Sequence, residues 1–382
     1  MATSPNFNWP EPDNTDLVKS GALAIRTAVN AIDTSLVDLK GGTTGQVLAK
    51  ASNTDMDFTW AADAGAPESY GFTAGKNKII NGDFRVWQRG TTFTSPATNS
   101  YTADRWVTNQ DGSGTVTISQ QSFTPGTAPV AGYEAPFFLR QAVTAAGSTT
   151  FFQMQQKIED VRTFANQTVT FSFWAKADSS RTGLVYWEQN FGSGGSATVQ
   201  STVFPAPALT TSWQRFTYTF TLPSISGKTI GTNSCLIFYI RNGGTASGAN
   251  LDIWGAQLEA GSTATAFQTA TGTIQGELAA CQRYFWSWSG NGLVAEIRSA
   301  SQAYASMKLP ITMRTAPTAT FLASPTTAYT VNSAGKSGGI ASIGQDSSSA
   351  DIYTFSIGLS GYTAGQSGFF FGNSGTQFSA EL

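Results

Sequence analysis

The sequence has 382 residues, and at the usual domain size of ~100–200 residues it has room for two or three domains. Apolar residues make up 40% of the chain and charged residues only 12%, about half of the ~25% that is normal for globular proteins. The formal net charge is −2, so the chain lacks the basic footprint of a nucleic-acid-binding protein. It contains no long uncharged apolar run and no signal-peptide pattern, so we expect neither membrane insertion nor secretion.

The chain contains no histidine and only two cysteines, Cys235 and Cys281. Without histidine, it cannot use Ser-His-Asp or Cys-His nucleophilic catalysis or His-ligated zinc and iron. Cys235 lies in an apolar run, which predicts a buried free thiol. One disulfide between the two cysteines is the alternative, but two cysteines do not make a secreted-type disulfide framework.

Close to the start, apolar residues repeat at alternating spacings of four and three, which is the heptad seam of a coiled coil. The seam consists of Val18, Ala22, Ile25, Val29, Ile32, Leu36 and Leu39. Its d positions are mostly β-branched, which favours three or four strands over two. Polar residues 13–16 offer N-cap oxygens and Gly41-Gly42 ends the helix. We predict a short trimeric coiled coil; the alternative is one amphipathic helix docked on a domain.

The helix is the centre of an N-terminal region that we assign to residues 1–65. Residues 1–16 are polar and contain proline, which predicts an extended arm. Two strand-like pieces within residues 43–60 flank a turn at residues 52–55, which predicts a small hairpin. Residues 66–76 are assigned to a linker, because the stretch around them is rich in alanine and glycine.

Several short motifs in this region match known proteins in combination. They are Trp9-Pro10-x-Pro12, Thr15-Asp16-Leu17-Val18-Lys19, Ala31-Ile32-Asp33, Gly45-Gln46-Val47-Leu48 and Asp57-Phe58-Thr59-Trp60. Residues 8–61 resemble the N-terminal region of phage tail fibres, especially those of phages that infect cyanobacteria. The resemblance implies that this end attaches to a tail or baseplate protein of the virion.

From residue 77 onwards the hydrophobic period changes to two, which is typical of half-buried strands. Residues 168–175 place Val169, Phe171 and Phe173 on one face, and residues 215–222 alternate aromatic residues with threonine. Further strands follow, separated by glycine-rich turns and with no helical pattern between them. The sequence therefore predicts an antiparallel sandwich.

Six motifs in residues 77–270 occur in a fixed order in one family. They are Asn77-Lys-Ile-Ile-Asn-Gly-Asp-Phe84, Trp87-Gln-Arg-Gly90, Tyr101-x-Ala-Asp-Arg-Trp106, Phe171-Ser-Phe-Trp-Ala-Lys176, Trp213-Gln214 and Ile253-Trp-Gly-Ala-Gln-Leu-Glu259. This region resembles a jelly-roll domain of phage tail proteins that is related in plan to carbohydrate-binding modules. The fold class that we expect is therefore mainly β: a short N-terminal trimeric coiled coil, an antiparallel jelly-roll sandwich and a small C-terminal β domain.

Residues 271–382 are assigned to the C-terminal β domain, a candidate receptor-binding tip. Strands are predicted at residues 318–322, 352–359 and 368–371. Residues 310–317 and Ala380-Glu381-Leu382 are similar to the C-termini of tail fibres. Loops of this domain are expected to hold aromatic residues for recognition: Trp286, Trp288, Tyr304, Tyr329, Tyr353 and Tyr362. Recognition by the jelly roll instead of this domain remains open.

The outward faces of three jelly-roll strands carry aromatic side chains beside amides and charges. This combination suits a sugar, whose CH-rich face stacks on a ring while its hydroxyls need donors and acceptors. The candidate glycan-binding residues are Trp174, Lys176, Tyr186, Glu188, Tyr239 and Arg241. The alternative is that these aromatic residues pack under loops or against neighbouring chains.

Two sets of charged residues in the jelly roll, one acidic and one rich in arginine, have a candidate structural role. In carbohydrate-binding jelly rolls an acid on the final strand often joins N-terminal oxygens in a calcium site, which here implies Asp252 with Asp83; an outward-facing Asp252 without metal is the alternative. No other cofactor is expected. Arginines 85, 89 and 105 lie near tryptophans 87 and 106, where a network with Asp83 and Asp104 is favoured over an anionic-ligand patch.

These observations lead to one expected function and two rivals. The expectation is a homotrimeric tail fibre in the virion, made in the host cytoplasm, that adheres to host-surface polysaccharide and is not an enzyme. Three weak sites on one trimer become strong through effective concentration. The rivals are a tailspike-like glycan depolymerase and a purely structural baseplate protein. The sequence has neither a recognisable carboxylate pair for glycoside hydrolysis nor a long β-helix repeat.

Overall fold

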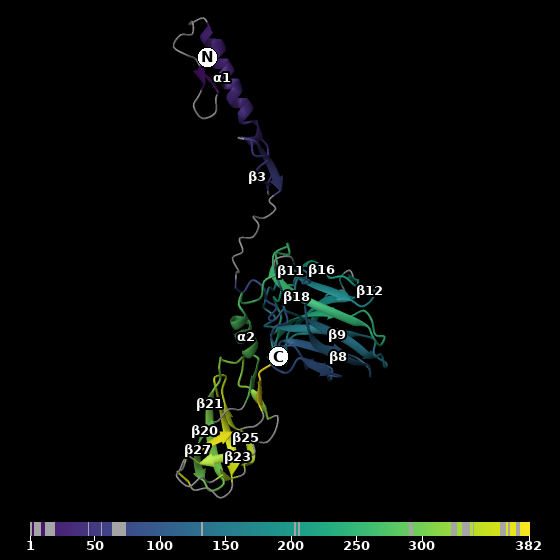
Figure 1. The fold of residues 1–382 in the computed structure, drawn as a ribbon, viewed down its shortest axis with the longest axis vertical. Helices are drawn as coiled ribbons and strands as arrows, with labels where there is room; N and C mark the ends of the chain where they lie inside the picture. The colour runs from purple at the N-terminus through teal and green to yellow at the C-terminus, as the bar shows by residue number, and fades with distance from the viewer. Residues whose placement is uncertain are drawn as a thin grey trace. The chain divides into compact units, whose positions relative to one another are not determined.

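The computed structural model describes residues 2–3, 9–11, 20–44, 46–54, 56–62, 74–130, 133–201, 204, 207–289, 293–321, 327–330, 337–338, 340–359, 364–365, 367–371 and 375–382. The chain forms two compact units, residues 1–71 and residues 72–382 (Figure 1). Most of the predicted linker, residues 66–73, lies outside the described residues. No helix among the described residues is long and apolar enough to span a membrane.

The N-terminal unit contains helix α1 (Gly21–Ser35), a 3-10 turn η2 (Val37–Leu39) and two strand pairs. Strand β1 (Ala2–Thr3) pairs with β2 (Pro10–Glu11), and β3 (Gln46–Lys50) pairs with β4 (Phe58–Ala62) as the predicted hairpin. The predicted cap residues 13–16 and Val18 lie outside the described residues. The α-helix ends at Ser35, six residues before the glycines that were expected to end it, so the seam residues Leu36 and Leu39 lie beyond it. Gly41 and Gly42 follow the 3-10 turn with φ values of +90° and +87°.

Helix α1 has two apolar faces with different environments. On one face Ala24 is buried, and the Trp9 indole Nε1 donates a 3.0 Å hydrogen bond to Ser35 Oγ, so the arm packs against the helix. The heptad face lies about a quarter turn away, and Ile25 and Val29 on it are 59% and 56% exposed. These two seam positions are therefore uncovered in the single chain.

The larger unit begins with a two-layer antiparallel sandwich, which confirms the predicted fold of this region (Figure 1). Sheet 1 has the order β14 (Val199–Gln200), β13 (Leu184–Asn190), β17 (Cys235–Arg241), β10 (Phe152–Glu159), β7 (Trp106–Gln110) and β6 (Ser100–Tyr101). Sheet 2 has the order β16 (Gln214–Thr221), β11 (Thr168–Ala177), β18 (Asn250–Ala260), β9 (Phe137–Ala145), β8 (Thr115–Ser122) and β5 (Thr92–Thr94). A short pair, β12 (Arg181–Thr182) with β15 (Ala208–Leu209), lies outside both sheets.

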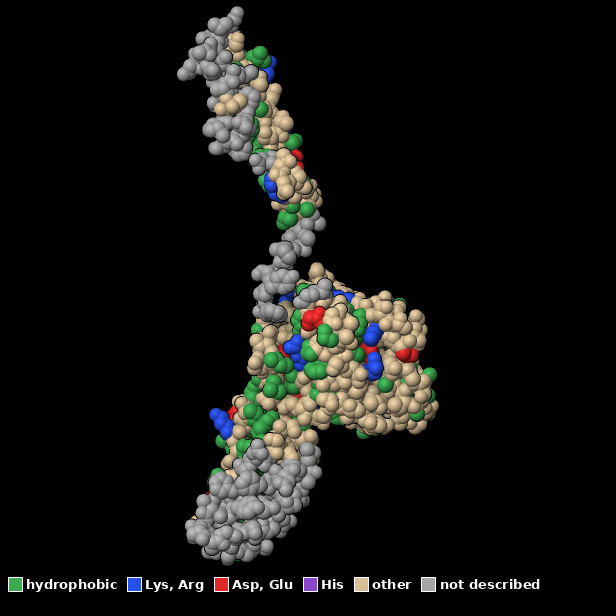
Figure 2. Space-filling view, in the orientation of Figure 1, with side chains coloured by type: hydrophobic (Ala, Val, Ile, Leu, Met, Phe, Trp, Pro, Cys, Tyr) green, Lys and Arg blue, Asp and Glu red, His purple; other side chains and the backbone are tan. Residues whose placement is uncertain are grey.

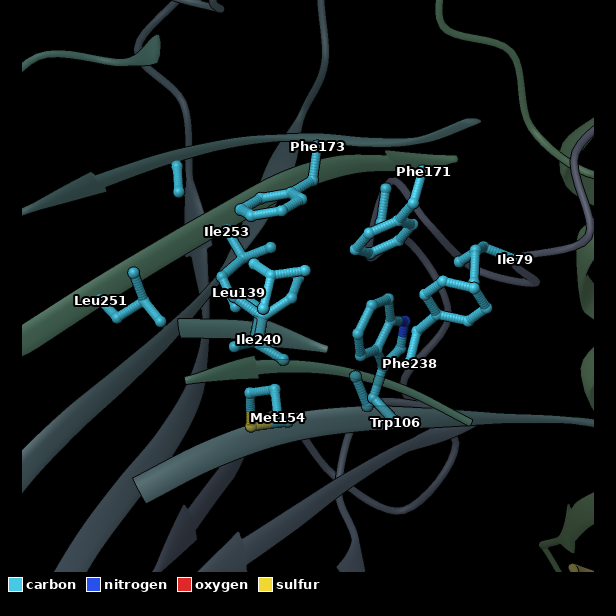
Figure 3. Close-up of a cluster of buried hydrophobic side chains, with 14 of the residues drawn as sticks. Ile79, Trp106, Leu139, Met154, Phe171, Phe173, Phe238, Ile240, Leu251 and Ile253 are labelled. Carbon is cyan, nitrogen blue, oxygen red and sulfur yellow. The ribbon is translucent and has the colours of Figure 1, made fainter. Parts of the chain in front are cut away.

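The core lies between the two sheets and follows the predicted alternation (Figure 3). Val169, Phe171 and Phe173 on β11 are fully buried, and the Phe171 ring lies 4.8 Å from Phe238 on β17 between ring centroids. Burial of each such ring stabilises the sandwich by about 1.5–3 kcal/mol. Cys235 and Cys281 are both buried and free, so the predicted free thiol is confirmed and the alternative disulfide is not formed.

Helix α2 (Ile274–Gln282) follows the sandwich and is held against it by Glu277. The Glu277 carboxylate is buried and accepts 2.8 Å hydrogen bonds from the backbone N–H groups of Asn81 and Thr271. Thr273 caps the helix, because its side chain accepts a hydrogen bond from Gly276 N–H. The sequence analysis predicted no helix here.

A small C-terminal β domain follows, as predicted. One sheet has the order β19 (Phe285–Trp288), β28 (Thr376–Ser379) and β22 (Thr318–Phe321). The other has the order β24 (Ser337–Gly338), β23 (Thr327–Thr330), β27 (Ser367–Phe371), β20 (Leu293–Ser299), β21 (Gln302–Lys308), β26 (Ile352–Leu359) and β25 (Ile340–Ser348).

The prediction that loops of this domain hold the aromatic residues is wrong for most of them. Trp286 and Trp288 lie on β19 and Tyr304 lies on β21, while Tyr353 is buried on β26. Tyr329 lies on β23, and Tyr362 is outside the described residues. Trp286, Trp288 and Tyr353 pack in the core of the domain, where Trp286 stacks on Phe378. Tyr304 lies between the buried Ala303 and Ala305, so alternation turns its ring to the opposite face, next to Arg298.

Candidate functional site

The structure divides the six predicted glycan residues between the two outer faces of the sandwich. Trp174 and Lys176 lie on β11 and point away from the core on the outer face of sheet 2. The other four, Tyr186, Glu188, Tyr239 and Arg241, lie on β13 and β17 of sheet 1. The six residues therefore cannot form one site.

On the sheet 2 side, Trp174 is not an open platform. Its side chain is only 8% exposed and packs against Trp254 and Phe267, with centroid distances of 5.3 Å and 6.4 Å. The Arg215 guanidinium lies over the Trp174 ring at 4.6 Å. Because these groups cover the ring, the prediction of an exposed aromatic residue at this position is wrong, and packing under loops is what the structure shows.

Lys176 and Asp252 belong to a charged cluster on the same outer face. Asp252 accepts two hydrogen bonds from Arg140, from Nε at 2.7 Å and from Nη2 at 2.8 Å, and Lys176 Nζ lies 3.7 Å from the same carboxylate. Such a bidentate pair satisfies both carboxylate oxygens. Lys176 also lies 5.2 Å from the Trp213 ring.

This geometry contradicts the calcium site implied by the resemblance. Asp252 is neutralised by arginine and lysine, and Asp83 is paired with Arg85 at 3.1 Å. Among the described residues, no three acidic, cysteine or histidine side chains gather as metal ligands. Calcium prefers several uncompensated oxygens, so the residues present do not fit it.

On the sheet 1 side, the centre of the outer face is a pair of stacked tyrosines. The Tyr186 and Tyr239 rings are parallel within 8°, with centroids 4.1 Å apart, and each residue is 7% exposed. The Tyr186 hydroxyl donates to Gln153 Oε1 at 3.0 Å, and the Tyr239 hydroxyl donates to Glu188 Oε2 at 3.2 Å. Burial raises the pKa of both hydroxyls, and the Glu188 charge raises that of Tyr239 further. Both therefore remain donors at neutral pH.

Next to the pair, Arg241 and Phe151 line a cavity of about 280 Å³ at the end of strand β17. We call it the Arg241 cavity; its other lining residues are Thr150, Phe152, Thr182, Leu184, Gly243, Gly244 and Thr245. The Arg241 guanidinium lies 4.3 Å from the centroid of the Phe151 ring. Its Nε and Nη2 donate to Gln153 Oε1 at 3.3 Å and 3.1 Å, so Gln153 fixes the orientation of the guanidinium.

Sequence reasoning missed Phe151 and Gln153. Phe152 is buried in the core, so alternation along β10 turns its neighbours Phe151 and Gln153 to the outer face. The pair Phe151-Phe152 carried this information, because two adjacent phenylalanines at a strand start cannot both face the core. The cavity combines a half-buried ring, a cation and hydroxyl and backbone groups, which suits a polyhydroxyl ligand near the small end of ligand-pocket volumes, ~300 Å³.

The predicted arginine–carboxylate network is present, with one partner that the sequence did not reveal. Arg89 lies 3.5 Å from Asp104, and both Arg89 and Arg105 also pair with Glu381 from the C-terminal domain. Instead of the predicted tryptophans, the guanidinium groups lie over Phe285 at 3.4 Å and Tyr284 at 3.5 Å. This buried network joins the two domains and is not a binding patch.

A second cavity, of about 290 Å³, lies beside helix α2 and is lined by Asp83, Arg85, Tyr133, Glu134 and Glu277 among others. Asp83 is almost fully buried, and burial raises its pKa to about 6 despite the opposing charge of Arg85. Three of the lining residues are carboxylic acids, so the cavity differs in character from the Arg241 cavity, whose described lining has none.

Residues 139–236 match a protein family described as carbohydrate binding domain, and this stretch covers the centre of the sandwich. Among solved structures, the chain is similar to the enzymatically active domain of tailspike protein 4 of bacteriophage CBA120, with 14% identity and a TM-score of 0.31 over 48% of this chain. That alignment spans 21% of the tailspike chain.

The chain is also similar to two carbohydrate-binding domains. The CBM22-1 xylan-binding domain of Paenibacillus barcinonensis Xyn10C aligns with 15% identity and a TM-score of 0.29, covering 50% of this chain and 98% of that one. The N-terminal cellulose-binding domain of Cellulomonas fimi β-1,4-glucanase C aligns with 19% identity and a TM-score of 0.28, covering 42% and 90%. No curated protein matches the sequence.

Proposed function

We propose that this protein is a homotrimeric phage tail fibre that adheres to glycans of the host surface through the Arg241 cavity of its sandwich. The observation that carries the proposal is the position of this cavity on the sandwich whose residues 139–236 match a carbohydrate-binding family: Phe151 lies within the match and Arg241 lies five residues beyond it. Phe151 is half-buried, and the part of its ring that Arg241 does not cover offers an apolar surface for the CH groups of a sugar. The N–H groups of Arg241 that Gln153 does not accept are donors for the sugar hydroxyls. Three such sites on one fibre would act together by multivalency.

The charge around the site supports a neutral glycan. Among the described residues that line the Arg241 cavity, Arg241 is the charged one, and Gln153 already accepts two of its hydrogen bonds. On the face of the molecule that Figure 2 shows, charged side chains are scattered over the sandwich and form no continuous basic patch on that face. An anionic polymer would need several cations along its path.

The proposal is tested by incubating the labelled full chain with an array of neutral and acidic oligosaccharides and with a panel of cyanobacterial cells. We expect binding to a subset of neutral glycans and to cells that display them. Binding to cells that survives removal of their surface polysaccharide would contradict it. Failure to bind any cell or glycan would favour a structural baseplate role instead.

We further propose that helix α1 forms a trimeric coiled coil and that residues 1–65 attach the fibre to a tail or baseplate protein of the virion. The exposed seam residues Ile25 and Val29 support self-association, since the arm covers a different face of the helix. The resemblance of residues 8–61 to tail-fibre N-termini supports the attachment. The virion location is tested by detecting the protein in purified phage particles.

Sedimentation tests the trimer. The full chain is expected to sediment as a trimer, and Ile25→Asp with Ile32→Asp to sediment as a monomer, because charges would be buried at the axis without partners. Leu23→Asp is the matched control, since Leu23 is 66% exposed and lies off the seam. A monomeric wild-type protein would refute this part of the proposal.

We propose binding without catalysis. Glycoside hydrolysis uses two carboxyl groups that flank the scissile bond. The described lining of the Arg241 cavity contains no aspartate or glutamate, which supports adhesion over depolymerisation. The measurement is the release of new reducing ends from a bound polysaccharide, and we expect none above the rate of a buffer control. Sustained release would favour the depolymerase.

A further inference from the structure

We propose that the acidic cavity beside helix α2 is a second binding site, which takes the primary ammonium group of a ligand about the size of one amino sugar. We call it the Asp83 cavity; its lining includes Asp83, Arg85, Tyr133, Glu134 and Glu277. Its volume of about 290 Å³ is close to the small end of ligand-pocket volumes, ~300 Å³. The inference goes beyond the proposed function, because the described linings of this cavity and the Arg241 cavity have no residue in common.

The described lining of the Asp83 cavity is negatively charged. Asp83, Glu134 and Glu277 contribute three carboxylates, and Arg85 contributes one guanidinium, which leaves a net charge of −2 when all four groups are ionised. Asp83 and Glu277 are each only 1% exposed, so little water screens their charges. The cavity therefore favours a cation over a neutral or anionic ligand.

One carboxylate oxygen at the floor of this cavity lacks a hydrogen-bond donor. Arg85 Nε lies 3.1 Å from Asp83 Oδ2, whereas the buried Asp83 Oδ1 accepts no hydrogen bond from any residue that the structure describes. Folded proteins rarely leave a buried polar atom unpaired, and functional sites are one of the places where they do. A ligand with an N–H group at the floor of the cavity would pair this oxygen.

The other two carboxylates contribute charge in different places. Both oxygens of Glu277 are already occupied, Oε2 by Asn81 N–H at 2.8 Å and Oε1 by the N–H and hydroxyl of Thr271 at 2.8 Å and 3.0 Å. Glu134 is exposed, and its Oε2 accepts one hydrogen bond, from Gly126 N–H at 3.1 Å. Glu277 therefore adds negative potential inside the cavity, and Glu134 adds it on the solvent side.

The geometry of the acceptors selects among cations. Calcium takes six to eight oxygen ligands, and a guanidinium fork uses both oxygens of one carboxylate, but Arg85 already lies at Asp83 Oδ2. An ammonium group is a compact charge with rotatable donors, so one unpaired oxygen is enough to orient it.

Tyr133 supplies an aromatic wall for the same ligand. Its ring lines the cavity and is held in place by Trp254 and Phe267, at centroid distances of 5.5 Å and 5.8 Å. Burial raises the pKa of the Tyr133 hydroxyl to about 12, and the Asp83 charge raises it further, so the hydroxyl stays neutral at pH 7. A neutral phenol ring attracts a cation and also packs against the CH groups of a sugar.

The experiment is calorimetric titration of the full chain with glucosamine at pH 7 and constant ionic strength. Glucose and N-acetylglucosamine are the matched ligands, because both keep the sugar ring and lack the ammonium charge. We expect glucosamine to bind at least tenfold more tightly than either, and calcium chloride at the same concentration not to displace it. Equal affinity for the three sugars, or displacement by calcium, would overturn the inference. Neither result bears on the proposed function, which concerns the Arg241 cavity.

Variants locate the site. Asp83→Asn keeps the shape of the side chain and removes its charge, so we expect at least tenfold weaker glucosamine binding, with thermal unfolding confirming that the variant is folded. Glu134→Gln changes an exposed carboxylate that the fold does not need, and we expect a twofold to fourfold loss. Asp178→Asn, the same substitution outside the cavity, is the matched control and should bind as the wild type. Unchanged glucosamine affinity in both cavity variants would overturn the inference.

Discussion

The two outer faces of the sandwich carry the same kinds of residue but differ in how far those residues are exposed. Both carry aromatic residues beside charged ones at alternating positions, on β11 for sheet 2 and on β13 and β17 for sheet 1. On sheet 2, Trp254 and Phe267 cover Trp174, whereas on sheet 1 the Arg241 cavity remains open beside the covered tyrosine pair. Alternation decides which side of a sheet a residue faces, and distant segments decide whether it reaches solvent.

Of the changes that distinguish the two faces, Trp254→Ala is expected to have the largest effect on stability. This side chain is fully buried under the loops of sheet 2, so Trp254→Ala should lower the free energy of unfolding by about 3–5 kcal/mol through the cavity that it leaves. The affinity of the folded protein for its glycan should stay within twofold. Thermal unfolding and array binding measure the two quantities, and Trp213→Ala, at a half-buried position, serves as a milder control. Loss of binding without loss of stability would place the site on sheet 2.

Glu381→Ala probes residues 380–382, which contact sheet 1 through Tyr101 and Lys157. It removes the partner of Arg105, whose side chain is buried, and an uncompensated buried charge costs about 3–5 kcal/mol when no other group compensates. Since Arg105 keeps its hydrogen bond to Lys157 O and its contact with Tyr284, we expect a loss of about 3 kcal/mol. Denaturant unfolding measures it, with Glu296→Ala at an exposed pair as the control. Equal stability of both variants would contradict the described position of the segment.

Two carboxylates of the sandwich, Asp83 and Asp178, are expected to change stability with pH in opposite directions. Burial raises the pKa of Asp83 from its usual value of 3.8 to about 6. The folded state then holds a proton that the unfolded state has released, so the contribution of Asp83 is lost as the pH rises from about 4 to about 6, by up to about 3 kcal/mol. Asp83→Asn should remove this slope, as determined by unfolding at each pH.

Asp178 provides the comparison with the opposite sign. Burial alone would raise its pKa, but the hydrogen bonds from Arg181 and from Asn250 N–H lower it overall. Its contribution is therefore present at neutral pH and lost as the pH falls through the lowered value. If Asp178→Asn and Asp83→Asn changed the pH profile in the same direction, the assignment of Asp83 would be wrong.

The smallest effect is expected at Tyr239. Tyr239→Phe keeps the ring stacked on Tyr186 and removes the hydroxyl that donates to Glu188, so stability should fall by about 1 kcal/mol. Because both tyrosines are only 7% exposed, monosaccharide binding should not change. A large loss of monosaccharide binding would mean that the tyrosines contact the sugar directly.

The strands and the core of the sandwich could be predicted from the local pattern of apolar residues. Val169, Phe171 and Phe173 face the core as their period of two requires, and the strand predicted at residues 352–359 is β26. The hairpin at residues 46–62 was also predictable, because turn residues separate two short strand-like pieces. Each of these features depends on neighbours within about ten residues.

The site was only partly predictable, because its boundaries come from distant segments. Tyr186, Glu188, Tyr239 and Arg241 face outward together as expected, but Leu382, more than 140 residues further along the chain, packs against the cluster that contains both tyrosines. Trp174 was placed on the right side of its strand and is nevertheless buried by Phe267. Asp252 was a candidate metal ligand on the resemblance alone; it pairs with Arg140 on another strand, at a separation that no local pattern reveals.

The most direct test of the central claim compares glycan binding by the full chain with that of Phe151→Ala combined with Arg241→Ala. Both side chains line the same cavity, and Lys176→Ala on the other face is the matched control. The account predicts at least tenfold weaker binding of the double variant, ~1.4 kcal/mol or more, with the control unchanged and both proteins folded. Undiminished binding by the double variant, or loss in the control alone, would contradict it.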